Sequence, residues 1–117
     1  MLPPSVRVFV AVAPVDMRRS FDGLFEATQA VIRQDPFSGH LFVFRGKTGK
    51  RVKVLFWDRS GLCIYYKRLE KGVFTFPKTP PEEASIEIEA ADLSLILEGI
   101  DLTDAKRRAR YVPVFRA

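Results

Sequence analysis

Lysine and arginine side chains cluster near the middle of the chain, among aromatic ones. Residues 45–53 carry five positive charges and no negative one, and the segment Gly46-Lys47-Thr48-Gly49-Lys50 within them is typical of a hairpin loop. Cations neutralise phosphates, and aromatic rings stack on exposed bases. The pattern therefore indicates a surface for nucleic acid. The alternatives are a solvated basic surface and a strand pair whose cations protect a sheet edge against aggregation.

The charges are distributed unevenly along the 117 residues. The net charge is +5, but residues 82–104 hold eight acidic side chains and no basic one, so the rest of the chain carries all nineteen basic residues and only six acidic ones. A second cationic cluster lies at residues 106–110, within a weakly patterned stretch, 103–117, that we expect to form a basic tail or an arm that orders on binding. This asymmetry favours a cationic face for a polyanion.

Residue types that would support catalysis or bind a cofactor are scarce. The chain has one histidine, His40, and one cysteine, Cys63, which excludes multi-histidine or cysteine-based metal sites and internal disulfides. The segment Gly46-Lys47-Thr48 lacks the upstream glycine of a phosphate-binding Walker loop. Asp58 and Glu70 lie at opposite ends of one expected strand, too far apart to share a metal. We expect no catalytic residues, no metal and no cofactor, with His40 as a hydrogen-bonded turn residue.

Hydrophobic segments are short. No apolar run approaches the ~18 residues that cross a bilayer, and Pro3, Pro4 and Arg7 interrupt the first twelve residues, which are unlike a signal peptide. We expect a cytoplasmic protein that does not contact a membrane.

Alternation and turn residues predict the elements that position these side chains. A β-branched run at 6–12 indicates a strand, and apolar residues at helical spacing indicate a helix over 21–34 with Ser20 as N-cap. Strands are expected at 41–45, 51–57, 62–69 and 73–77, with a half-exposed strand at Ile86 and Ile88 and a short helix at 92–98 that stops at Gly99. The expected fold is α+β, an antiparallel β-meander of about five strands, with one main amphipathic helix packed on one face and a short C-terminal helix. Residues 1–102 would form a single domain.

Hairpin lengths predict which side chains share a face of this sheet. The turn at 58–61 places Lys53 opposite Tyr66 and Arg51 opposite Arg68, and the loop at 46–50 places Arg45 opposite Arg51. One end of one face would then collect Arg45, Arg51, Lys53, Tyr66, Arg68, Phe74 and Phe76. The opposite face, covered by the main helix, would hold Phe42, Phe44, Val52, Val54, Phe56, Cys63, Tyr65 and Leu69.

Several segments together resemble one protein family. They are 15–24 (VDMRRSFDGL), 35–44 (DPFSGHLFVF), 55–61 (LFWDRSG), 66–72 (YKRLEKG) and 97–100 (LEGI). In this order, over about residues 7–102, they are similar to TnpB, the second-open-reading-frame accessory protein of IS-sixty-six type insertion sequences. The resemblance implies a role in transposition beside a separate, larger transposase that carries the catalytic residues.

Two hypotheses for function follow. The leading one is a non-catalytic accessory protein that binds DNA at the ends of a mobile element and assists the transposase. Its candidate DNA-binding residues are Arg45, Lys47, Lys50, Arg51, Lys53, Tyr66, Arg68, Lys106, Arg107, Arg108 and Arg110. The alternative is a protein-interaction module that docks on the transposase through an exposed patch of Trp57, Tyr66, Phe74 and Phe76, without direct DNA contact.

Overall fold

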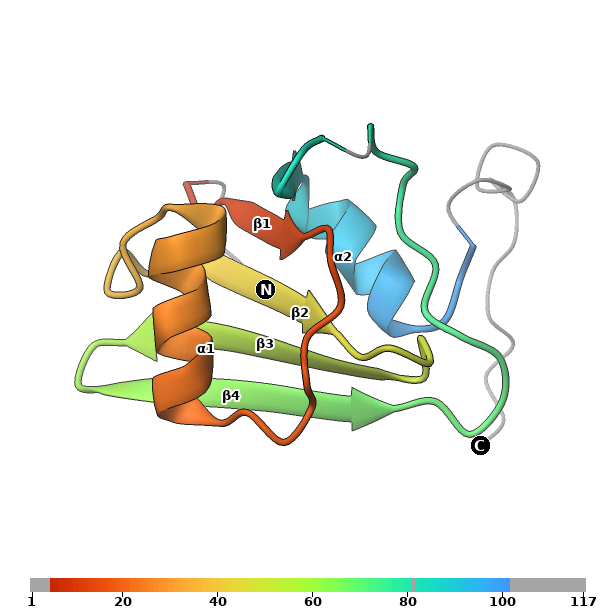
Figure 1. Ribbon diagram of the computed structural model, residues 1–117, viewed down its shortest axis with the longest axis horizontal. Coiled ribbons are helices and arrows are strands. Elements are labelled where there is room, and N and C mark those ends of the chain that lie inside the picture. Colours follow the sequence, from red (N-terminus) through yellow and green to blue (C-terminus); the bar gives the residue numbers. More distant parts are fainter. Residues whose placement is uncertain (1–4, 81, 102–117) are drawn as a thin grey trace.

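A five-stranded sheet with helices on both faces forms the protein (Figure 1). The computed structural model describes residues 5–80 and 82–101. The strands are β1 (Val8–Ala11), β2 (Leu41–Arg45), β3 (Arg51–Asp58), β4 (Gly61–Arg68) and β5 (Ser85–Ile88), in the spatial order β4-β3-β2-β1-β5. The helices are α1 (Phe21–Ala27), which continues as the π-helical η1 (Thr28–Ile32), and α2 (Ala90–Leu97). The α+β class is as expected. In the described residues, no helix is long and apolar enough to cross a membrane.

The sheet is mixed, which corrects the expected antiparallel meander. Strands β2, β3 and β4 are antiparallel neighbours, but β1 pairs with β2 in parallel and with β5 antiparallel. All four residues of β1 are buried, as in an inner strand covered on both faces. The connection from β1 through α1 crosses over the sheet before it returns in β2, so the two strands run in the same direction.

Residues 73–77 do not form the expected strand. The Phe74 N–H donates to the carbonyl oxygen of Gly49 at 2.8 Å, and the Phe74 side chain is buried. The segment thus joins the protein through a backbone hydrogen bond to the β2–β3 loop and through the rings of Phe74 and Phe76, which pack with the α2 core. Its place among the five strands is taken by β1.

Both helices form near the expected positions. The first ends at Ile32 rather than at residue 34, because Arg33 adopts a left-handed conformation with φ 61°. Ser20 occupies the N-cap position, but its side chain makes no capping hydrogen bond. Helix α2 begins two residues before the expected start and stops before Gly99. There, with φ 81°, Gly99 donates its N–H to the Ile96 carbonyl and Ile100 donates to Leu95, as a Schellman cap requires.

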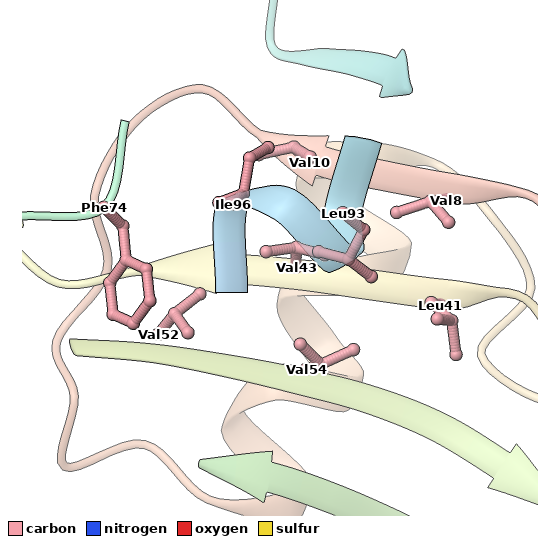
Figure 2. Packing of buried hydrophobic residues seen from close by; sticks show 9 residues of the cluster. All are labelled: Val8, Val10, Leu41, Val43, Val52, Val54, Phe74, Leu93 and Ile96. Carbon is pink, nitrogen blue, oxygen red and sulfur yellow. The ribbon is translucent and has the colours of Figure 1, made fainter. Parts of the chain in front are cut away.

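Each face of the sheet carries its own hydrophobic core. Helix α2 packs Leu93 and Ile96 against valines of β1, β2 and β3 (Figure 2). Helix α1 and η1 cover the opposite face, where the buried residues are Phe9, Ala11, Leu24, Ala27, Ile32, Phe42, Phe44 and Leu55. The sheet therefore has two hydrophobic cores where one was expected, and α2, not α1, covers the face that carries Val52 and Val54.

The register of one hairpin explains this difference. As expected, Lys53 pairs with Tyr66 and Arg51 with Arg68 across β3 and β4. Across β2 and β3, however, Arg45 pairs with Val52 and not with Arg51, because the Gly46 N–H continues the ladder to the Arg51 carbonyl. A slip of one residue moves every side chain of a strand to the other face. Phe42 and Phe44 therefore share the α1 face with Lys53, while Arg45 lies on the α2 face.

Candidate nucleic-acid interface

A groove of about 710 Å³ lies between the loop at 14–17 and the β2–β3 hairpin. Its lining is Pro14, Val15, Asp16, Met17, Gly46, Lys47, Thr48, Lys50, Arg51 and Arg68. Four of the cations expected to bind DNA thus meet in one concave site. The loop that forms the other wall is a part of the site that the sequence analysis did not identify, although residues 15–17 open one of the segments that carry the family resemblance.

Short-range contacts hold the two walls together. The Val15 N–H donates to the Arg45 carbonyl oxygen at 2.9 Å. Gly46 is buried against Met17, and a Cβ built on Gly46 would lie 2.8 Å from the Met17 Cγ. Real Cβ atoms do not approach this closely, so only glycine lets Met17 lie against the hairpin. The groove is therefore formed without a ligand.

The cations at the groove are concentrated and poorly neutralised. Lys47, Lys50, Arg51 and Arg68 are all exposed. Arg51 lies directly opposite Arg68 on neighbouring strands, an arrangement that is destabilising for like charges. The Arg68 guanidinium contacts Glu70 at 3.1 Å, but both side chains are largely exposed, and such pairs contribute little. An anion placed between the two arginines would remove their repulsion.

Lys53 lies beneath this surface and has an internal role. It is 8% exposed, and its Nζ donates to the carbonyl oxygens of Met17 and Arg19, both at 2.7 Å. The same Nζ lies 4.7 Å from the centre of the Tyr66 ring, a cation–π contact. These contacts correct the expectation that Lys53 meets phosphate: it holds the 17–19 turn in place. Tyr66 itself is 48% exposed.

Arg45 is separated from the groove cations by the sheet. Its Nε donates to the Val12 carbonyl oxygen at 3.1 Å, and its guanidinium lies 6.0 Å from the centre of the Phe76 ring. Phe74, at 5% exposure, and the half-buried Phe76 pack with the α2 core. The expected basic-aromatic face is therefore divided between both sides of the sheet. The alternative patch is not formed either, because Trp57 and Tyr66 lie on the α1 face.

One carboxylate, Asp16, also lines the groove. It accepts hydrogen bonds from the Arg18 backbone N–H at 2.8 Å and from the Arg18 guanidinium at 2.7 Å. The side-chain hydrogen bond from Arg18, reinforced by the backbone one, lowers the pKa of Asp16 from 3.8 to about 2. The Arg18 guanidinium therefore neutralises the Asp16 carboxylate, so Asp16 does not neutralise the cations of the β2–β3 hairpin.

The remaining candidate residues are accounted for as follows. Lys106, Arg107, Arg108 and Arg110 lie outside the described residues. His40 accepts a hydrogen bond from the Arg7 N–H through Nδ1 at 3.0 Å, the structural role expected for it. Within residues 5–80 and 82–101, no three histidine, cysteine or carboxylate side chains gather as a metal site would require.

Comparison with known proteins identifies the family. The model of a family described as "IS66 Orf2 like protein" matches residues 6–107. The chain belongs to this family. Membership of the IS66 Orf2-like family supports the accessory role in transposition that the sequence motifs imply, and it fits a transposase as partner.

Two relatives extend over nearly the whole chain. This IS66 Orf2-like protein is 37% identical over 110 residues to the uncharacterized protein y4jC of Sinorhizobium fredii (strain NBRC 101917 / NGR234), and the match covers 92% of each chain. It is 43% identical over 103 residues to the uncharacterized protein y4hO of the same strain, covering 86% of this chain and 88% of the relative. No solved structure matches the chain.

Proposed function

We propose that the protein is a non-catalytic accessory factor of transposition that binds DNA through the groove between residues 14–17 and the β2–β3 hairpin. The observation that carries this proposal is the placement of Arg51 directly opposite Arg68, with Lys47 and Lys50 beside them, at a preformed concave surface. The fold gains nothing from opposing two arginines on adjacent strands. A bound phosphodiester would be attracted by both guanidinium groups, and its negative charge would offset the repulsion between them.

Salt-titrated binding to element-end DNA, measured with and without the transposase, tests this proposal. Each phosphate neutralised by a cation releases counterions, so the logarithm of the affinity should fall with the logarithm of salt concentration, with a slope of roughly −2 or steeper for a four-cation site. Addition of the transposase should tighten the complex. If the purified protein does not bind element-end DNA at low salt, the proposal is refuted.

A second candidate function, docking on the transposase, rests on the other face of the sheet. There, Leu41, Phe56, Leu93 and Leu97 line an apolar groove of about 520 Å³ between α2 and β3. Pull-down of the transposase after nuclease treatment separates the candidates. If docking is the function, Leu97→Asp should abolish capture, while replacement of Lys47, Lys50 and Arg51 by alanine should leave it intact.

A further inference from the structure

The two walls of the cationic groove differ in chemistry. The loop side presents the apolar Pro14, Val15 and Met17, together with Asp16, whose carboxylate is paired with Arg18, and the hairpin side presents Lys47, Lys50 and Arg51. A ligand that fills the groove must therefore offer a flat or compact apolar part and an anionic part a short distance away. A nucleotide has this composition, since its base carries the apolar face and its phosphate carries the charge.

The shape of the site selects among forms of nucleic acid. It is an open groove of about 710 Å³, which leaves room for a base and its sugar along the apolar wall. A duplex hides its base faces by stacking, so only its backbone and the edges of its bases could contact the apolar wall. An unpaired strand can place a base inside and use its π face.

Hydrogen bonds join the two walls of the groove to the sheet. Lys53 anchors the carbonyl oxygens of Met17 and Arg19 from below, and the Val15 N–H is bonded to the Arg45 carbonyl. Little ordering is needed when a preformed site is filled, so more of the contact energy contributes to affinity.

A stacking platform lies next to the groove. The Tyr66 ring, 48% exposed, packs over the Lys53 Nζ that holds Met17, and it shares the α1 face with Arg51 and Arg68. A strand whose phosphates follow the two arginines would bring a neighbouring base onto this ring.

From these features we infer that the groove binds unpaired nucleotides: one base lies against Val15 and Met17, the next stacks on Tyr66, and the connecting phosphates meet the hairpin cations. This inference rests on the proposed DNA-binding function and specifies its substrate as single-stranded nucleic acid.

Fluorescence anisotropy with three probes tests the inference; the two single strands carry equal numbers of phosphates, and the duplex carries twice as many, which by charge alone would favour the duplex. The probes are a labelled single strand of about eight nucleotides, the duplex of the same sequence, and an abasic strand that keeps the phosphates and lacks the bases. At one salt concentration the intact strand should bind at least about five-fold more tightly than either other probe, since a stacked base contributes ~1–3 kcal/mol.

Variants at the tyrosine pair separate stacking from charge. Tyr66→Ala should weaken binding of the intact strand about five-fold or more and leave the abasic strand unchanged, whereas Tyr66→Phe should retain binding. Tyr65→Ala is the matched control, since Tyr65 is similarly exposed on the opposite face. Thermal melting of each variant verifies folding.

Each outcome is decisive. Equal or tighter binding of the duplex, or equal binding of the abasic strand, overturns the inference while the proposed DNA-binding function stands. Failure of all three probes to bind refutes both.

Discussion

The Nζ of Lys53 donates a hydrogen bond to the backbone carbonyl oxygen of Met17 at 2.7 Å. Through this contact a lysine in the middle of β3 holds the loop that forms the apolar wall of the cationic groove. A strand residue thus positions a loop that lies 34 to 36 residues earlier in the sequence.

Replacement of Lys53 by methionine should therefore destabilise the fold. Methionine fills a similar volume but leaves the Met17 and Arg19 carbonyl oxygens without their charged donor, at a cost of about 2 kcal/mol. Urea unfolding measures the loss. The control is Lys47→Met, an exposed position, where the change should stay within about 0.5 kcal/mol. Equal effects at both positions would contradict the anchoring role.

Gly46→Ala should destabilise the protein by about 1–3 kcal/mol, because the added methyl collides with the Met17 side chain. In combination with Met17→Ala, the cost of Gly46→Ala should shrink, which a double-mutant cycle in urea detects as coupling between the two positions. Gly61→Ala is the control, since a Cβ there meets nothing within 4 Å. Additive effects of Gly46→Ala and Met17→Ala would show that their contact is unimportant.

Arg51→Gln should affect stability and DNA binding in opposite directions. Removing one charge of the Arg51–Arg68 pair relieves cross-strand repulsion, so the free energy of unfolding at low salt should rise by up to about 0.5 kcal/mol. Affinity for DNA should fall, and its salt dependence should become shallower by nearly one counterion. Chemical unfolding and anisotropy measure the two changes. Loss of stability with unchanged DNA affinity would indicate a purely structural arginine.

The Asp16–Arg18 pair predicts a pH dependence of stability. The pKa of Asp16 is lowered from 3.8 to about 2 in the folded protein, so the ionised group stabilises the fold above the unfolded value and this contribution is lost as pH falls through about 4 toward 2. Glu87, whose pKa is lowered mainly by its hydrogen bond with Arg7, acts with the same sign. The melting temperature of Asp16→Asn should therefore decline less over this interval than that of the wild type. Parallel declines would contradict the assignment.

The sequence predicted the register of the β3–β4 hairpin, although the strand ends differ by one residue, because Arg59 and Ser60 form a short turn whose length determines the pairing. It failed at the β2–β3 hairpin, where one additional backbone hydrogen bond from Gly46 to Arg51 shifts the pairing and reverses the faces of β2. The parallel pairing of β1 was also missed, since partners 33 residues apart leave no local signal.

For the candidate site, the cationic hairpin was predictable from charge alone, and Lys47, Lys50, Arg51 and Arg68 do converge. The apolar wall could not be predicted, because residues 14–17 are distant from the hairpin in the sequence and contact it only in the folded protein. Nor could sequence distinguish Lys53 from its neighbours: the partners that bury this lysine are backbone carbonyl oxygens, which every residue has.

The most direct test of the central claim compares two triple variants of equal net charge. One replaces Lys47, Lys50 and Arg51 by glutamine, and the other replaces the exposed cations Arg33, Arg59 and Lys78, which do not line the cationic groove. Measured by salt-titrated anisotropy on element-end DNA, the groove variant should lose at least about ten-fold in affinity with a markedly shallower salt slope, while the control stays within about three-fold of wild type. Equal losses in both variants would mean that net charge alone attracts DNA, and would contradict binding in the groove.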